Sequence, residues 1–397
     1  MKRILISLLA AFALCLCATA QVPADLYYVI FSDHKTKLIN ASDGTCIFEQ
    51  EGGYQEVAID NRHNVYTIEH DLSSNSYTVY KNGKVYQELD RKSKKQYYTS
   101  MAMTVVGNDV VVAGVESREF NEKGFESRLV GFVNGELAYQ TEWLRKSLKR
   151  DRFIGCRRII GSGSTAGTEA VTGYNAITED YGLKSYDTRS LVYHVCAVDY
   201  VDGDIYTTGW GEREYSETPV GYTTQYMVRR CPRVWKNGKQ IIQQYENRTG
   251  AAYNIHVMRH GKNILTSGHQ RNHICAWDGN KVMIQTNSNI AAIVKEAVIY
   301  NGMADGTPLF TRMLLTDERI LYMVNNAKKG ELQPILVDSR DIKDVVAIGN
   351  DFYALSSNNK IYKYSSPNWM SGNYTSSTVL KFNVSTDDSL CGLVAPR

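Results

Sequence analysis

Half of the histidines in this 397-residue sequence lie within one stretch of eighteen residues. They are His256, His260, His269 and His273. His269 and His273 flank a Gln-Arg-Asn turn, so their imidazoles could approach each other and bind a metal ion. No carboxylate stands at a convincing spacing beside them, and surface-loop histidines are the favoured explanation. The sequence therefore predicts no metal site and no cofactor.

A basic segment offers a second kind of chemistry. Residues 145–158 are rich in cationic side chains, and a Gly/Ser/Thr-rich stretch follows at 161–168. The cationic residues with the strongest claim to a role are Arg145, Lys146, Lys149, Arg150 and Arg152. Arginine pairs well with carboxylate or sulfate groups, so a long loop at about 144–192 that binds an acidic glycan is one interpretation. A solvated insertion is the other, and the sequence does not separate them.

The elements that would position such residues are short strands. Apolar runs rich in Val, Ile, Tyr and Thr recur along the chain and are broken by Gly, Asn and Asp, which is typical of β-structure. Six segments align without a gap, each an apolar strand, a polar turn and a second strand. They are 58–69, 103–114, 198–209, 257–268, 313–324 and 345–356.

A second repeated signature is a hairpin dipeptide placed between apolar runs. Its clearest copies are Asn82-Gly83, Asn134-Gly135, Asn237-Gly238 and Asp278-Gly279. Asn-Gly and Asp-Gly readily take the positive φ angles of a type I′ turn, whose twist matches the flanking strands. Each repeat is therefore expected to be one hairpin followed by another, which makes a four-stranded antiparallel sheet.

These hairpins carry a resemblance to a known class of proteins. Residues 234–239 read Val-Trp-Lys-Asn-Gly-Lys, and the chain resembles secreted bacterial β-propeller proteins with repeated Val-Trp-Lys-Asn-Gly hairpins over about residues 25–395. A radial arrangement covers both faces of each sheet and leaves only short edges. The prediction is an all-β, single-domain β-propeller over residues 21–397. Propellers host many functions, so the resemblance says little about activity.

The two ends of the sequence predict how the ring closes. Residues 25–32 resemble the second strand of a repeat that lacks its first, and residues 389–395 resemble a first strand that lacks its second. Together they would complete one blade, which brings the count to seven. The stretches 144–192 and 288–308 are extra sequence in this alignment, so six and eight blades are the alternatives.

Aligned positions also predict a site, because the innermost strands of a propeller surround its central channel. One residue before each aligned segment, three consecutive repeats carry His256, Arg312 and Asp344 where the others carry small apolar residues. Glu56, His194 and Tyr253 stand nearer the strand starts. The prediction is that these six residues form a polar channel mouth. The alternative is that Arg312 and Asp344 form a structural ion pair between blades.

The first twenty residues predict export. Lys2 and Arg3 precede an almost unbroken apolar run that is too short to span a bilayer, and the small residues at 18–20 suit cleavage before Gln21. The mature protein is expected in the periplasm or outside the cell, with no transmembrane segment. The formal net charge is +3, and Lys2 and Arg3 supply two units of it. So small a charge gives no overall positive field that would attract nucleic acid, and no nucleic-acid partner is predicted.

The cysteines after this segment are widely and irregularly spaced, with no Cys-x-x-Cys pair. They are Cys46, Cys156, Cys196, Cys231, Cys275 and Cys391. Export permits disulfides, but buried single thiols in strands are the favoured interpretation.

Two function classes fit these observations. The sequence contains no Gly-x-Ser-x-Gly, no His-Glu-x-x-His and no phosphate-binding loop. The favoured class is a binding or scaffold module whose partner is a glycan, including an acidic one, or another protein. The alternative is a carbohydrate-active enzyme of the lyase or glycosidase kind, in which Arg would neutralise a uronate and His or Tyr would move protons at the channel.

Overall fold

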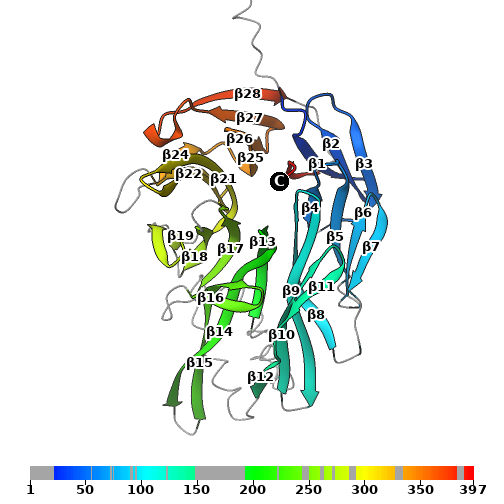
Figure 1. Ribbon diagram of the computed structural model, residues 1–397, viewed down its shortest axis with the longest axis vertical. Coiled ribbons are helices and arrows are strands. Elements are labelled where there is room, and N and C mark those ends of the chain that lie inside the picture. The colour runs from blue at the N-terminus through cyan, green and yellow to red at the C-terminus, as the bar shows by residue number, and fades with distance from the viewer. Residues whose placement is uncertain are drawn as a thin grey trace, which may run out of the picture.

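The computed structural model is a ring of seven antiparallel sheets, which confirms the predicted seven-bladed β-propeller (Figure 1). It describes residues 22–397 without the following: 55, 72–73, 75, 90–92, 94–95, 122–123, 148–192, 221–222, 244–249, 260–262, 271–272, 286–291, 327–333 and 382–388. The predicted signal segment lies outside these residues. No helix of the described chain is long and apolar enough to cross a membrane.

In each blade the strands run in order from the channel outward. Blade 1 is β29 (Ser389–Val394), β1 (Tyr27–Ser32), β2 (Lys35–Asn40) and β3 (Cys46–Glu51). Blade 2 is β4 (Glu56–Ile59), β5 (Val65–Asp71), β6 (Ser76–Lys81) and β7 (Lys84–Leu89). Blade 3 is β8 (Gln96–Val106), β9 (Asp109–Asn121), β10 (Gly124–Val133) and β11 (Glu136–Gln140), with β12 (Leu144–Ser147) paired to β10.

The other four blades follow the same order. Blade 4 is β13 (Tyr193–Val201), β14 (Asp204–Val220), β15 (Thr223–Lys236) and β16 (Lys239–Gln243). Blade 5 is β17 (Gly250–Val257), β18 (Ile264–Gln270), β19 (His273–Asp278) and β20 (Lys281–Gln285). Blade 6 is β21 (Ile293–Ala304), β22 (Thr307–Thr316), β23 (Leu321–Asn325) and β24 (Ile335–Asp338). Blade 7 is β25 (Ile342–Ile348), β26 (Asp351–Ser356), β27 (Lys360–Ser365) and β28 (Thr375–Lys381), with the short 3-10 helix η5 (Trp369–Ser371) before β28.

The Asn-Gly dipeptides form the turns between the third and fourth strands, as predicted. Asn82, Asn134 and Asn237 have φ angles of 50°, 51° and 46°, a conformation that asparagine tolerates better than most residues. Each Oδ1 also accepts a hydrogen bond from the first or second residue of the second strand in its own blade: Val65 N at 2.8 Å, Val110 N at 3.0 Å and Ile205 N at 2.8 Å. The asparagine therefore shapes the outer turn and ties it to the inner hairpin.

The ring closes through strands from opposite ends of the sequence, which also confirms a prediction. β29 pairs antiparallel with β1, for example Tyr27 with Val394 and Tyr28 with Leu393. Figure 1 shows the red end of the chain beside the blue first strands, at the inner side of the ring. Leu390 and Leu393 are buried against residues of blades 1 and 7, so β29 fills the space that the missing first strand would leave.

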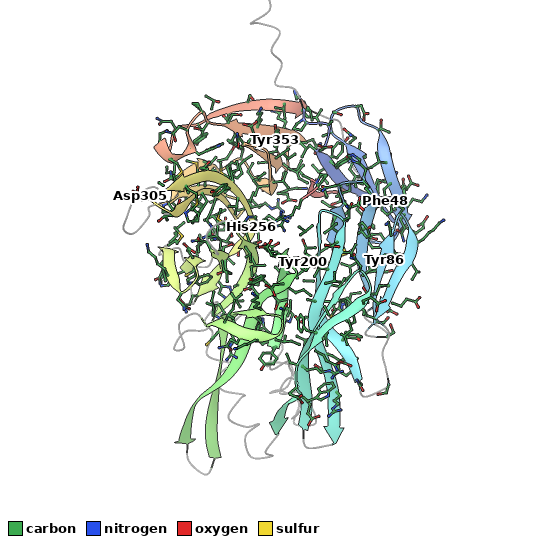
Figure 2. All side chains as sticks on the ribbon, in the orientation of Figure 1. Phe48, Tyr86, Tyr200, His256, Asp305 and Tyr353 are labelled. Atoms are coloured by element: carbon green, nitrogen blue, oxygen red, sulfur yellow. The ribbon has the colours of Figure 1, made fainter. Side chains whose placement is uncertain are left out.

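The hydrophobic core lies between neighbouring blades. Trp235, 1% exposed, belongs to the Val-Trp-Lys-Asn-Gly hairpin of blade 4 and lies in one cluster with residues of blade 3. Figure 2 shows Phe48 and Tyr86 on the outer strands of blades 1 and 2, whereas Tyr200 and His256 lie at the inner side of the ring. Sheet-to-sheet packing thus holds the inner strands around a common axis.

Blade 6 departs from the predicted alignment. Segment 313–324 lies on β22 and β23, the second and third strands, and not on the first and second. The true innermost strand, β21, lies in the stretch 288–308, which the alignment treats as extra sequence. Its hairpin turns at Asp305 and Gly306, whose φ angles of 50° and 75° are typical of such turns. Every hairpin of a four-stranded sheet has the same apolar-polar-apolar pattern, so the pattern alone does not tell which hairpin it is.

The predicted long loop and the cysteines have mixed outcomes. The start of the loop, 144–147, is strand β12, and 148–192 lies outside the described residues. No disulfide links the five cysteines that the structure describes. Cys231 and Cys275 are buried, as predicted, but Cys46 and Cys391 are exposed and Cys196 is half-buried. Cys156 lies outside the described residues.

Candidate functional site

The innermost strands of all seven blades surround a cavity of about 910 Å³ at the centre of the ring. Its acidic and basic lining residues are Glu56, Asp199, His256, Arg259, Lys295, Glu296 and Arg397. They come from β4, β13, β17, the turn after β17, β21 and the segment after β29. A cavity lined by many separate strands and carrying both signs of charge is the candidate functional site of this protein.

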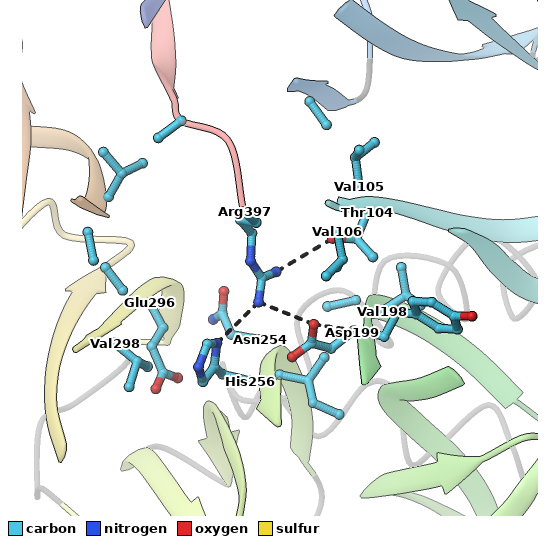
Figure 3. A pocket seen from close by; sticks show the side chains of 18 of the residues that line it. Thr104, Val105, Val106, Val198, Asp199, Asn254, His256, Glu296, Val298 and Arg397 are labelled. Atoms are coloured by element: carbon cyan, nitrogen blue, oxygen red, sulfur yellow. Dashed lines mark hydrogen bonds and ion pairs between the residues drawn. The ribbon is translucent and has the colours of Figure 1, made fainter. Parts of the chain in front are cut away.

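Arg397, the last residue of the sequence, reaches from the end of β29 into this cavity (Figure 3). Its Nη2 donates to Asp199 Oδ1 and to His256 Nδ1, both at 3.2 Å, and its Nη1 donates to Thr104 Oγ1 at 3.5 Å. A main-chain oxygen of Arg397 accepts from Gly107 N at 2.8 Å. One side chain from blade 1 therefore contacts blades 3, 4 and 5 across the cavity.

Asp199 is the acid that faces this guanidinium. Its carboxylate is 2% exposed. Oδ2 accepts from Val257 N of the next blade at 2.7 Å, and Oδ1 accepts from its own neighbour Tyr200 N at 2.9 Å. Two backbone donors thus fix the carboxylate in place independently of Arg397.

His256 lies beside Asp199 on the adjacent blade. Burial lowers the pKa of its imidazole, and the positive charge of Arg397 lowers that pKa further. His256 is therefore neutral at pH 7. Because a guanidinium can only donate, Nδ1 must be the accepting nitrogen, which leaves the proton on Nε2.

Glu56 contributes a second acid to the cavity. Its Oε2 accepts from Met103 N of the next blade at 2.7 Å. Burial raises the pKa of this carboxyl from its ordinary 4.5 to about 7, although the hydrogen bond from Met103 N and the charge of Lys295 oppose the shift. Glu56 therefore titrates near neutral pH.

This raised pKa predicts how the stability of the ring depends on pH. Between pH 4.5 and about 7 the folded protein holds a proton on Glu56 that the unfolded chain has lost, so this group makes stability fall as pH rises through that window. The substitution Glu56→Gln keeps an acceptor for Met103 N and removes the charge. We expect Glu56→Gln to unfold like the parent at pH 4 and to be more stable by up to about 3 kcal/mol at pH 8. Denaturant unfolding at the two pH values measures this, and an equal difference at both would contradict it.

Three of the six predicted channel-mouth residues line the cavity: Glu56, Tyr253 and His256. Tyr253 stacks on His269 of the neighbouring strand, with ring centroids 5.5 Å apart. His194 does not line the cavity, and its ring lies parallel to that of Trp210 at 5.2 Å. Glu56, Tyr253 and His256 therefore belong to the candidate site, whereas His194 packs within blade 4.

Arg312 is predicted in the channel, and this prediction is wrong. It lies on β22, is 0% exposed and inserts between blades 5 and 6. Its partner is Glu296, with Nε to Oε1 at 2.6 Å and Nη2 to Oε2 at 2.9 Å, and it also donates to the carbonyl oxygens of Trp277 and Thr266. The physical reason is the displaced alignment of blade 6, which places a second-strand residue on the innermost strand.

Asp344 does lie on an innermost strand, β25, but it is not bonded to Arg312. Its Oδ2 accepts from Leu393 N of blade 1 at 2.8 Å, and Lys295 Nζ approaches Oδ1 at 3.6 Å. Glu56, Asp199 and Asp344 thus use one kind of contact, in which a carboxylate accepts from a backbone N–H of the next blade. The alternative prediction, an ion pair of Asp344 with Arg312 between blades, is therefore also wrong, although Asp344 does connect blade 7 with blades 1 and 6.

The remaining predicted groups are not assembled into a site. Within the described parts of the chain, no three or more His, Cys, Asp and Glu side chains are grouped so that they could hold a metal ion. His260 lies outside the described residues. In the predicted anionic-ligand loop, Lys149, Arg150 and Arg152 lie outside them too, as do the side chains of Arg145 and Lys146. The acidic-glycan interpretation of that loop stays a prediction.

Sequence reasoning missed Asp199, Glu296 and Arg397. A signal for Asp199 exists, because it is a charged residue inside the aligned apolar segment 198–209. The predicted site, however, was chosen from residues that precede each aligned segment, so a residue inside a segment was not considered. β-Bulges shift the register in β13 after Val195 and in β17 after Ala252, so a fixed offset from the aligned segment does not point to the same side of the strand in every blade.

No protein-family model and no curated protein matches this sequence. Solved structures with a similar fold include the computationally designed Ika8 protein (12% identity, TM-score 0.44, covering 87% of this chain and 81% of that one). Others are extracellular domains 1–2 of Drosophila Semaphorin 1a (8%, 0.42, 85% and 85%) and Saccharomyces cerevisiae Sqt1 (8%, 0.44, 91% and 84%). The fold and the site define a seven-bladed β-propeller with a charged central cavity, and its function must be inferred from that cavity.

Proposed function

We propose that this protein is a secreted binding or scaffold module whose partner, another protein or a glycan, engages the central cavity. The observation that carries the proposal is the cavity of about 910 Å³, lined by acidic and basic side chains on inner strands of blades 2, 4, 5 and 6 and on the segments that follow β17 and β29. Rigid sheets hold these groups at fixed positions, which lowers the entropic cost of binding. The N-terminal segment with Lys2, Arg3 and its apolar run supports secretion.

The arrangement favours binding over catalysis. A lyase-like site would need a cation that is free to neutralise a uronate, next to a group that moves protons. Arg312 is buried against Glu296, Arg397 faces Asp199, and Lys295 lies 3.6 Å from Asp344. Among the described residues this leaves Arg259, in the turn after β17, as the cavity cation outside these ion pairs. Glu56, whose pKa is raised to about 7, is the group in the cavity best suited to proton transfer, and it supports the carbohydrate-active enzyme as a second candidate.

A matched pair of substitutions tests whether the cavity is the binding site. Val294 lines the cavity and is 46% exposed, whereas Val85 on the outermost strand of blade 2 is 56% exposed and lies outside it. We expect Val294→Trp to weaken partner binding about tenfold or more by filling part of the cavity, and Val85→Trp to leave it unchanged. Melting temperatures of both variants should match that of the parent protein.

The probes are polygalacturonate, a neutral glucan and proteins secreted by the source cells. Binding of the proteins is detected by a cross-linker attached at position 294, and a cross-linker attached at position 85 is the control. New reducing ends in either polysaccharide would support the enzyme instead. Equal binding by the two tryptophan variants would overturn the cavity as the site. Export is checked by mass spectrometry of the mature protein, which should begin at Gln21.

A further inference from the structure

The cavity wall formed by Thr104, Asp199 and His256 already holds a guanidinium group, that of Arg397. We propose that this wall is a binding site for an arginine side chain, filled in this structure by the chain's own Arg397, and that a protein partner inserts an arginine in its place. The inference rests on the proposed function and names the chemistry that the cavity recognises.

Contacts other than those of Arg397 hold the acceptors of this wall in place. Asp199 is oriented by the backbone N–H groups of Val257 and Tyr200, at 2.7 and 2.9 Å. His256 is neutral, because burial lowers the pKa of its imidazole, so its Nδ1 offers a lone pair. Removal of Arg397 would leave this carboxylate and this ring nitrogen facing the cavity as acceptors, and they match the donor-only guanidinium.

The other two acids that line the cavity do not compete for this guanidinium. Glu296 is paired with Arg312 in the interior, and Glu56 accepts from Met103 N and has a pKa raised to about 7 by burial. Asp199 is paired with Arg397 alone among the ion pairs of the described residues. A ligand that replaces Arg397 must therefore be cationic, because a buried carboxylate without a counter-charge is strongly unfavourable.

Arg397 is placed so that it can be displaced. Its side chain is 42% exposed, whereas Asp199 is 2% exposed. Only two residues separate it from the last residue of β29, and its main chain is held through the bond from Gly107 N. A side chain on so short a tether competes at an effective concentration on the order of millimolar, so a weak free ligand should not enter the parent protein but should enter a variant without the arginine.

Arg397→Ala tests this by calorimetry with N-acetyl-arginine amide as the probe. We expect the variant to bind the probe about tenfold or more tightly than the parent protein does. The citrulline analogue, which has the same shape and no charge, should bind the variant about tenfold more weakly than the arginine probe. Thr104→Val and Asp199→Asn in the Arg397→Ala background should each reduce binding of the probe, the second more strongly.

Two results would overturn the proposal. One is probe binding by Arg397→Ala that is no tighter than by the parent protein. The other is equal binding of the citrulline and arginine probes. If Asp199→Asn does not fold, the Thr104→Val variant and the citrulline comparison still decide the question. If the arginine probe fails while Val294→Trp still blocks the partner, the arginine site is wrong and the cavity remains the binding site.

Discussion

Deletion of residues 389–397 should lower the melting temperature by about 10 °C or more and cost several kcal/mol of stability. The deletion removes β29, the innermost strand of blade 1, and leaves β1 with an unpaired edge toward the channel. It also removes the buried side chains of Leu390, Leu393 and Val394 and the Leu393 N–H that donates to Asp344. Differential scanning calorimetry measures the effect.

The control is a deletion of residues 395–397 alone. This shorter deletion keeps β29 and its pairing with β1 but removes Arg397. We expect its melting temperature to fall by less than half as much, because the shorter deletion leaves Asp199 without its counter-charge but removes none of the buried apolar side chains of β29. Similar melting of both truncated proteins would show that strand pairing between the two ends of the sequence does not hold the ring closed.

Arg312→Ala should cost about 3–5 kcal/mol of unfolding free energy. Arg312 is 0% exposed and Glu296 is 2% exposed at the side chain, so the substitution leaves a buried carboxylate without its counter-charge. The carbonyl oxygens of Trp277 and Thr266 in blade 5 lose their donors at the same time. Blades 5 and 6 would thus lose the polar contact that Arg312 makes between them.

Arg319→Ala is the matched control for this substitution. Arg319 follows β22 in the same blade and pairs with Asp341, and both side chains are 52% exposed. An exposed pair of this kind contributes about 0–1 kcal/mol. The double substitution Arg312→Met with Glu296→Leu should recover much of the lost stability, because it removes both charges together. Denaturant unfolding of the set measures these differences, and similar costs for the two alanine variants would contradict the assigned role of Arg312.

Local chemistry allowed much of the fold to be predicted. Asn82, Asn134 and Asn237 have positive φ in hairpin turns because asparagine followed by glycine prefers that conformation wherever the chain places it. Alternating apolar residues then define strands on either side of each turn. The unpaired half-repeats at 25–32 and 389–395 predicted closure, because a strand that lacks its neighbour in sequence must find one elsewhere in a closed ring.

Which residues form the candidate site was decided by the tertiary structure. Arg312 and Glu56 were predicted to share one opening, yet Arg312 is enclosed between blades and Glu56 lines the cavity. The hairpins of a blade look alike in sequence, so only the assembled sheet shows that Arg312 is on a second strand. β-Bulges in the inner strands then decide which side chains face the channel.

The sequence itself therefore determined the turns and the strand periodicity, because both follow from interactions between residues that are near each other in the chain. It also determined that blade 1 is built from both ends of the sequence, because a single strand with an unpaired edge must find a partner strand. The meeting of Arg397 with Asp199 and His256 was decided by the ring. These residues are separated by 198 and 141 positions, and no local preference relates them. They come together because the radial packing of seven sheets brings every inner strand to one axis.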